Sequence, residues 1–506
     1  MKKRLLFLLL LLPLLLPGCR KTNNSSNNNG IRTIEIYATN DIHGQVQDDD
    51  QRVGISKLMT FLNEKGMDGN TLLLDQGDTW QGSIYSNYNH GELITDLMNY
   101  IHYDVRSVGN HDFDWGLDYL KTNTAKTYGG YAVPVLAGNV YDYDFSNKRN
   151  GNIQQIDIGG KSVTYILENG LKVGILGGIG DKQISTITSL YTRDICFEDV
   201  VSFIKSEAVH LRNDEHCDVV IASIHTGQED LLGKSLGDFV DLVLCGHTHK
   251  QESANEGLLY FSQSKAYAQS VGHITLKYDI NKKDVVKTTI QNISSSEIKS
   301  KTTSVEPTIQ RIVNNYNQEC QTAADEVLAR NVSGSFYSSE QYPNLMCKAI
   351  FDQCVKENYT DVFLTYVNNA RASNYGTTWT YADLYQAFPF DNMIYIAEIT
   401  GSELLNEIKN YNFIYRNPNY QSNVINKTSY YKIAVIDYVY FHTNDNRYYN
   451  YFPTTGGSST TTLSKNYREI LRDWLKDKGY NTTGGLKASD YSSSLWQHDR
   501  TAFVEA

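Results

Sequence analysis

Carboxylate, amide and imidazole side chains recur in the first half of this 506-residue chain, each time directly after a short apolar run. The stretch RSVGNHDFDWG, residues 106–116, is one example, and four other apolar runs end in the same way. The polar residues that follow the five runs are Asp41 and His43, then Asp78, then Asn110, His111, Asp112 and Asp114, then His225, and finally His247 and His249.

Side chains of these types suggest metal chemistry. Mixed carboxylate, imidazole and amide ligands without thiolate suit divalent Zn, Mn, Co or Fe. The candidates outnumber the four ligands of a single closed site, whereas two ions about 3.5–4 Å apart around a bridging carboxylate would use them all. Such a pair generates hydroxide near neutral pH and neutralises charge on phosphate oxygens. We therefore predict two divalent metal ions that serve phosphoryl transfer to water.

Each residue taken alone has a structural explanation. A single aspartate at a strand end is usually a turn or helix cap, and a single histidine is usually a surface or hydrogen-bonded residue. His247 and His249, however, are two residues apart in an extended segment, so their side chains point the same way. The repetition after five runs favours one shared site over independent turns.

The elements that must position these residues are strands that alternate with amphipathic helices. This alternation is typical of a layered α/β domain, where ligands collect at the carboxyl ends of strands. The sequence predicts helices over residues 53–65 and 197–213, and strands over residues 31–39, 70–76, 105–109, 171–178, 217–224 and 240–246.

The chain is too long for one ordinary hydrophobic core, so two or three domains are expected. A first domain is predicted over residues 31–300, and a polar linker helix over 306–330. Residues 331–506 mix helices with short aromatic strands and form a second domain. The net charge is −11 and no basic block follows the N-terminus, so a nucleic-acid polymer is not expected as a partner.

The N-terminus is typical of an export signal rather than of the fold. Residues 1–18 combine a basic start with an apolar run that contains proline and is shorter than the about 20 residues of a membrane span. The ending LPGC resembles a bacterial lipobox, which implies lipid attachment at Cys19 and a flexible tether over residues 19–30. We expect a lipid-anchored protein of the cell envelope, outside the cytoplasmic membrane, or a secreted one if Cys19 is not lipidated.

The motifs DIHG, GDTWQGS, GNHDFDWG, IHTG and GHTH together resemble those of the calcineurin-like metallophosphatases. Their order resembles the 5′-nucleotidase branch, which includes UDP-sugar hydrolases and 2′,3′-cyclic nucleotide phosphodiesterases. The resemblance implies a four-layer αββα metallophosphatase sandwich joined by a helix to a smaller α+β C-terminal domain of the 5′-nucleotidase type. It also implies one metal ion held by Asp41, His43, Asp78 and His249, and a second held by Asp78, Asn110, His225 and His247.

The same resemblance implies that His111 is the catalytic histidine and that Asp114 orients it. A cationic imidazole beside a phosphate can stabilise developing negative charge or protonate the leaving oxygen. The alternative for Asp114 is a cap of the next helix.

Residues 366–408 resemble the C-terminal domain of 5′-nucleotidases, and retain Arg371 and the segment PFDN. In the family this arginine contacts the phosphate or the nucleotide, and aromatic rings stack on the base, at about 1–3 kcal/mol per base. Phe452, Tyr448 and Tyr451 are the candidates for the stacking ring, with core packing as their alternative.

Together these features predict an extracytoplasmic phosphohydrolase of the 5′-nucleotidase type, acting on small nucleotides through a metal-bound hydroxide. A 2′,3′-cyclic nucleotide phosphodiesterase or a UDP-sugar hydrolase would use the same metals. A binding lipoprotein without catalysis would be expected to lack ligands, yet all seven are present beside His111.

Overall fold

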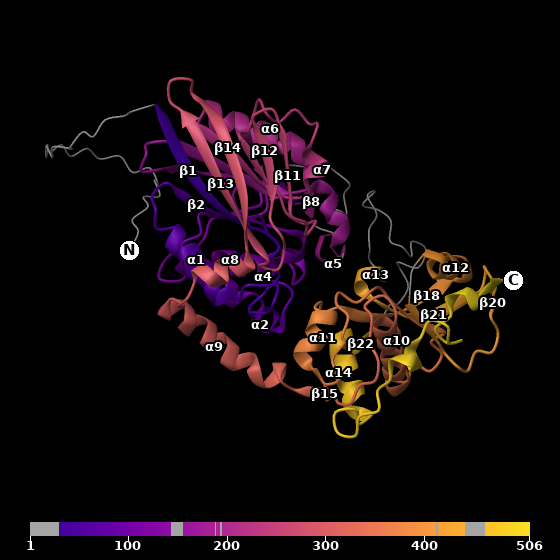
Figure 1. Ribbon diagram of the computed structural model, residues 1–506. Helices are drawn as coiled ribbons and strands as arrows, with labels where there is room; N and C mark the ends of the chain where they lie inside the picture. The colour runs from indigo at the N-terminus through magenta and orange to yellow at the C-terminus, as the bar shows by residue number, and fades with distance from the viewer. Residues whose placement is uncertain (1–29, 143–154, 188, 193–194, 411–412, 441–460) are drawn as a thin grey trace.

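The computed structural model describes residues 30–142, 155–187, 189–192, 195–410, 413–440 and 461–506. These residues form an N-terminal domain, indigo through magenta to salmon pink in Figure 1, and a C-terminal domain in orange and yellow. Helix α9, Pro307–Ala324, runs along the first domain towards the second.

Two six-stranded sheets form the centre of the N-terminal domain. The first has the order β14-β13-β1-β2-β3-β4, and the second β11-β12-β10-β9-β7-β6. Their bounds are β1 Ile31–Thr39, β2 Thr71–Asp75, β3 Val105–Ser107, β4 Val135–Leu136, β13 Ser270–Asp279 and β14 Asp284–Ser294, then β6 Ser162–Ile166, β7 Lys172–Ile179, β9 Val219–His225, β10 Leu242–Leu244, β11 Glu252–Glu256 and β12 Leu259–Gln263.

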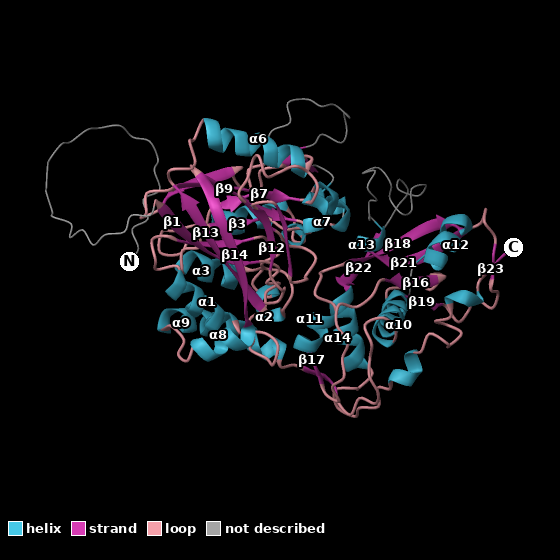
Figure 2. Ribbon diagram, turned by 45° about the horizontal axis from the view of Figure 1, so that its top comes forward, coloured by secondary structure: helices cyan, strands magenta, loops and turns pink. Residues whose placement is uncertain are grey.

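Alternating side chains of the strands divide the core into layers. Val219 and Ile221 of β9 pack between the two sheets together with Ile36 of β1, whereas Val220 and Ile224 of β9 pack in the outer layer with residues of α6. Figure 2 shows α6 on one side of the sheets and α1, α3, α8 and α9 on the other. The predicted αββα sandwich is therefore confirmed.

The helices of this domain begin and end close to the predicted bounds. The helix predicted over residues 53–65 is α1, and the one predicted over 197–213 is α6. The bounds are α1 Ile55–Lys65, α2 Ile84–Asn87, α3 Glu92–Tyr100, α4 Leu117–Ala125, α5 Ser189–Thr192, α6 Val200–Asn213, α7 Gln228–Leu231 and α8 Ser295–Lys301, with short 3-10 turns at Asn110–Phe113 and Asp181–Thr186 and a small β5–β8 pair at Val140–Asp142 and Ile195–Phe197.

The prediction of a linker helix over residues 306–330 is wrong at its C-terminal end. The helix ends at Ala324, and Val327–Ala329 form strand β15, which pairs with β17, Trp379–Thr380. Glu326 at this junction pairs with Arg472 Nε (2.5 Å) in the C-terminal domain. Contacts with the second domain thus outweigh the helical propensity of the segment.

The C-terminal domain is built on a mixed five-stranded sheet of order β19-β16-β21-β18-β22. Helices α10 and α14 pack against each other beside it, and α11 contacts α9 and α2 of the first domain. The bounds are β16 Leu364–Val367, β18 Met393–Thr400, β19 Phe413–Arg416, β20 Val424–Ile425, β21 Tyr430–Ile436, β22 Thr461–Asn466 and β23 Val504–Glu505, with α10 Gln341–Lys356, α11 Tyr381–Ala387, α12 Gly401–Asn410, α13 Asp437–Tyr440 and α14 Tyr467–Asp477.

Several predictions concern residues outside the described ranges. They are the signal peptide over residues 1–18, the lipidation site Cys19, and the candidate stacking rings Phe452, Tyr448 and Tyr451. Within the described ranges, no helix combines the length and the apolar character needed to cross a bilayer.

Candidate active site

The strand ends bring the predicted metal ligands to one edge of the N-terminal domain. Strands β1, β2 and β3 are parallel neighbours, as are β9 and β10. Their carboxyl ends are followed by the polar segments, so residues far apart in sequence meet in space. The ligands that meet there are Asp41 and His43 after β1, Asp78 after β2, Asn110 after β3, His225 at the end of β9, and His247 and His249 after β10.

These residues form two adjacent clusters. In one cluster the ligand atoms of Asp41, His43 and His249 lie within 4.8 Å of one another, and in the other those of Asp78, His225 and His247 do. Asp78 Oδ2 lies 3.3 Å from His225 Nε2 and 3.7 Å from His43 Nε2. This carboxylate therefore faces both clusters, as a bridging ligand must.

Asn110 faces the second cluster through its side-chain oxygen. Asn110 Oδ1 is 3.0 Å from His225 Nε2 and 3.0 Å from His247 Nδ1. In the first cluster, His43 Nε2 and His249 Nε2 are 3.0 Å apart. The oxygen and nitrogen lone pairs of both clusters thus converge.

The backbone at the site is in a conformation that non-glycine residues rarely adopt. Asp41, His43, Asp78, His247 and His249 have φ values of 49°, 50°, 53°, 79° and 62°. Left-handed non-glycine residues cost of order 1–3 kcal/mol each and are concentrated at functional sites. Five of them around one pair of clusters indicate a geometry selected for ligation rather than for stability.

Glycines allow the loops that carry Asp78 and Asn110 to pack together. A Cβ atom on Gly109 would lie 2.2 Å from Asp78 Oδ1, and one on Gly77, where φ is 90°, would lie 2.5 Å from the Gly109 nitrogen. The backbone N–H of His111 donates to Asp78 Oδ1 (2.7 Å). Asp78 Oδ2 is buried and has no hydrogen-bond partner among the described residues, so this oxygen is available to a cation.

Hydrogen bonds orient the imidazoles, and burial keeps two of them neutral. His43 Nδ1–H donates to the backbone carbonyl of Gln81 (2.8 Å) and His225 Nδ1–H to that of Gln76 (2.7 Å), so Nε2 of each ring faces the clusters. Burial lowers the pKa of His247 and of His249 to about 4, which keeps both rings neutral. The donor set therefore fits two divalent cations.

The carboxylate between the clusters is held in its charged form. Burial opposes the charge on Asp78, but the nearby His225 and His111 outweigh burial and hold the pKa of this carboxyl well below its usual range. In the same way the Asp78 carboxylate outweighs burial and raises the pKa of His225 to about 10, so a cation that binds to Nε2 of this ring must displace its proton. A negative charge is thus fixed at the position where the two clusters meet.

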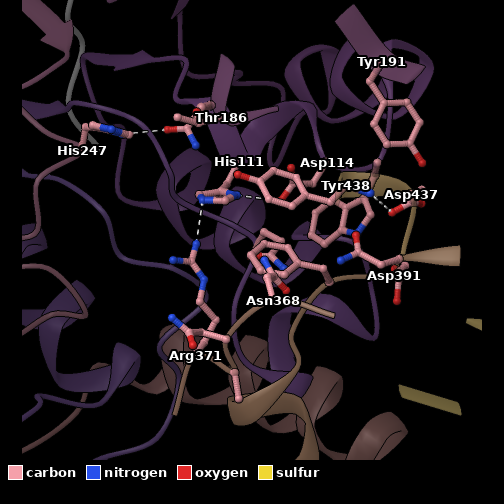
Figure 3. Close-up of a pocket in the computed structure, with 17 residues that line it drawn as sticks. His111, Asp114, Thr186, Tyr191, His247, Asn368, Arg371, Asp391, Asp437 and Tyr438 are labelled. Carbon is pink, nitrogen blue, oxygen red and sulfur yellow. Dashed lines mark hydrogen bonds and ion pairs between the residues drawn. The ribbon is translucent and has the colours of Figure 1, made fainter. Parts of the chain in front are cut away.

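His111 connects this centre to the C-terminal domain. Its Nδ1–H donates to Asp114 Oδ2 (2.8 Å), and its Nε2 accepts from Arg371 Nη2 (3.0 Å). The imidazole stacks on Phe390 with 5.3 Å between ring centroids, and the Arg371 guanidinium lies 5.0 Å from the centroid of the same ring. Figure 3 shows His111 between Asp114 and Arg371.

A cavity of about 480 Å³ separates the two domains at this point. In Figure 3, His247 lies at one end and Tyr191 and Asp437 lie at the other. The cavity is lined by Gln81, Asn110, His111, Asp114, Trp115, Thr186, Tyr191 and His247 of the first domain, and by residues 368–371, Phe390, Asp391, Asn392, Asp437 and Tyr438 of the second. Its metal-ligating end is polar and its far end is aromatic and acidic.

The structure brings together the seven predicted ligands, His111, Asp114 and Arg371. The sequence analysis missed Phe390, which contributes an aromatic ring to the cavity beside His111. The signal for this residue is its place in the segment PFDN, which resembles the corresponding segment of the 5′-nucleotidases.

Asn87 of α2 connects the loop after β2 to the C-terminal domain. Its Oδ1 accepts from the Gly82 N–H (2.8 Å) and its Nδ2 donates to the Pro389 carbonyl (2.8 Å). We expect Asn87→Leu to raise KM for a nucleotide roughly five- to tenfold with little change in kcat, because a neutral hydrogen bond contributes about 1 kcal/mol. Steady-state kinetics test this. Asn89→Leu is the control, since the side chain of Asn89 bonds to Tyr85 and Leu93 of the first domain. Equal KM values for both variants would contradict the prediction.

Comparison with known proteins agrees with this geometry. A family model described as calcineurin-like phosphoesterase matches residues 34–251. The trifunctional nucleotide phosphoesterase protein YfkN of Bacillus subtilis is 25% identical over 74% of this chain, and the 5′-nucleotidase of Diplobatis ommata is 25% identical over 73%.

The matches differ in how much of the other protein they span. This chain spans 27% of the length of the Bacillus protein and 69% of the Diplobatis protein. The crystal structure of a 5′-nucleotidase precursor from Thermus thermophilus superposes with a TM-score of 0.69, over 88% of this chain and 97% of that one, at 17% identity. Residues 34–251 thus match the calcineurin-like phosphoesterase family, and the chain has the two-domain fold of the 5′-nucleotidases.

Proposed function

We propose that this protein is a metal-dependent phosphohydrolase of the 5′-nucleotidase type that releases phosphate from small nucleotides. The observation that carries the proposal is the pair of ligand clusters that faces Arg371 and Phe390 across the interdomain cavity. The names of the relatives, a nucleotide phosphoesterase and a 5′-nucleotidase, support nucleotides as substrates. Location outside the cytoplasmic membrane, with a lipid anchor on Cys19, rests on the N-terminal sequence alone.

In this proposal one divalent cation binds to Asp41, His43, Asp78 and His249, and the other to Asp78, Asn110, His225 and His247. When bound, such cations supply Lewis-acid activation of water and of the phosphoryl oxygens. The ligand types suit Zn, Mn, Co or Fe.

The other residues of the cavity bind the substrate and move a proton. The Arg371 guanidinium, which donates to His111 Nε2 in the structure, would turn to a phosphoryl oxygen, a partner of matching charge and geometry. Phe390 offers a ring face on which any base can stack. As water attacks phosphorus and the bond to the 5′ oxygen breaks, His111 Nε2 would donate a proton to that oxygen, while Asp114 holds Nδ1.

Removal of the metals should abolish phosphate release from AMP. We expect activity to fall to background after prolonged dialysis against EDTA and to return when Zn or Mn is added, with metal content followed by mass spectrometry. Full turnover by protein shown to be metal-free would contradict the proposal. The same assay with 2′,3′-cAMP and UDP-glucose distinguishes a nucleotidase from the two alternative hydrolases, and no turnover of any phosphoester would leave only a binding function.

A further inference from the structure

A second cavity of about 190 Å³ lies on the His43 side of the ligand clusters. We refer to it as the side cavity. It shares Gln81 and Arg371 with the larger cavity, so both lie beside the same centre. Its other lining residues include Gln45, Arg52, Ser83, Tyr267 and Gln386.

The side cavity differs from the larger one in charge. Arg52 and Arg371 both line it, and among the described residues that line it none has a carboxylate. The larger cavity is instead lined by Asp114, Asp391 and Asp437. In a chain of net charge −11, a chamber with two guanidinium groups and no carboxylate favours an anion.

Gln81, which lines both cavities, has an unused hydrogen-bond donor. The residue is 2% exposed, and its Nε2 has no hydrogen-bond partner among the described residues. A buried amide without a partner is unfavourable, so this position is best explained by an acceptor that binds there. The backbone carbonyl of Gln81 accepts a hydrogen bond from His43 Nδ1 (2.8 Å), so the backbone is fixed and a ligand can bind only to the side chain.

Arg52 and Tyr267 form a built wall rather than a mobile surface. Arg52 Nη1 donates to Gln45 Oε1 (2.8 Å), and its guanidinium lies 5.5 Å from the centroid of the Tyr267 ring. Tyr267 has a left-handed φ of 58° and stacks on the His43 ring at 5.2 Å. Asp49, the other partner of Arg52, lies 3.5 Å from Nε, and its side chain is 47% exposed, so the guanidinium keeps much of its capacity for an anion.

We propose that the side cavity is a phosphate-binding subsite, distinct from the position where the scissile phosphoryl group meets the metal ligands. The proposal rests on the proposed function for the source of its ligand. The phosphate is either orthophosphate released by hydrolysis, which leaves by this side while the nucleoside fills the larger cavity, or a second phosphoryl group of the substrate. Gln81 Nε2 and Arg52 donate hydrogen bonds to its oxygens in both cases.

Isothermal titration of the metal-loaded protein with orthophosphate tests the subsite directly. We expect two orthophosphates per chain in the wild type. Gln81→Met should lower the affinity for the second orthophosphate by roughly ten- to a hundredfold, because the variant loses a hydrogen bond to a charged group. Gln81→Glu should abolish it by repulsion, Arg52→Met should weaken it at least tenfold, and Arg52→Lys should restore most of it. Arg311→Met, which removes an exposed arginine of α9, is the control and should bind as the wild type does.

Kinetics then distinguish the two sources. If the subsite takes released orthophosphate, Arg52→Met raises the inhibition constant of orthophosphate at least tenfold and leaves the ratio of kcat/KM for ADP and AMP unchanged. If it takes a second phosphoryl group, the same variant lowers kcat/KM for ADP about tenfold relative to AMP.

One orthophosphate per chain in the wild type, or unchanged binding in both Gln81→Met and Gln81→Glu, would overturn the subsite even if AMP is hydrolysed. If the wild type binds two orthophosphates and the variants lose affinity as expected, but the protein hydrolyses no phosphoester, the proposed function is overturned and the subsite stands. Thermal unfolding of every variant distinguishes a loss of binding from a loss of folding. If a Met variant fails to fold, Arg52→Lys and Gln81→Glu, which keep the side-chain size, test the subsite instead.

Discussion

Asp78→Asn is expected to lower kcat/KM for AMP about a thousandfold, equivalent to ~4 kcal/mol of transition-state stabilisation, and to reduce bound metal below one ion per chain. Asp78 Oδ2 is the carboxylate oxygen that faces both ligand clusters, at 3.3 Å from His225 Nε2 and 3.7 Å from His43 Nε2. Asparagine keeps the size of the side chain but loses the charge, and an amide group cannot bridge two cations as a carboxylate does. Both metal positions should therefore weaken together.

Metal content measured by mass spectrometry, beside the kinetics, tests this expectation. Asp75→Asn is a matched control three residues upstream, because Asp75 is also fully buried but accepts hydrogen bonds from Thr39 (2.7 Å) and Thr79 (2.8 Å). Burial raises the pKa of Asp75 to about 6, so this carboxyl is more easily neutralised than that of Asp78, whose pKa is lowered. We expect this control to keep both metals. Two metal ions per chain in Asp78→Asn would contradict the bridging role.

The metal centre could be predicted from the sequence because its information is local. Each ligand follows an apolar run whose alternation fixes a strand, and the observed β1, Ile31–Thr39, has the predicted bounds. Parallel neighbours then place their carboxyl ends at one edge without any knowledge of side-chain packing. The order of polar segments after the strands therefore predicts one shared site, whereas the division of the ligands into two clusters is implied by the family resemblance.

The substrate side could not be predicted in the same way because it depends on how the two domains pack. His111 and Arg371 are 260 residues apart and meet at 3.0 Å, and Phe390 contacts both of them. Asn87 bonds to the carbonyl of the neighbouring Pro389 across the same interface. No local pattern contains these contacts. The sequence likewise does not reveal that the buried side-chain amide of Gln81 lacks a hydrogen-bond partner beside the side cavity. The end of the linker helix also depends on tertiary contacts, because strand pairing with β17 begins at Val327.

His111→Ala is expected to lower kcat for AMP by about 10²–10⁴-fold, the usual contribution of general acid–base catalysis, while both metals remain bound. The variant keeps the backbone N–H that donates to Asp78 Oδ1 (2.7 Å), so the ligand between the clusters stays in place. Asp114→Asn should cause a smaller loss, because the ring remains and only its charged acceptor at 2.8 Å is replaced by a neutral one.

The dependence on the leaving group identifies what the ring does. The alkoxide of a nucleoside needs a proton as the phosphorus–oxygen bond breaks, whereas p-nitrophenolate is stable without one. If His111 Nε2 supplies that proton, His111→Ala loses much less activity on p-nitrophenyl phosphate than on AMP. Equal losses on both substrates, with metal content unchanged, would mean that the imidazole stabilises charge on the phosphoryl group instead. Burial and Arg371 lower the pKa of His111, but the carboxylates of Asp114 and Asp78 outweigh them and raise it, which favours the role of proton donor.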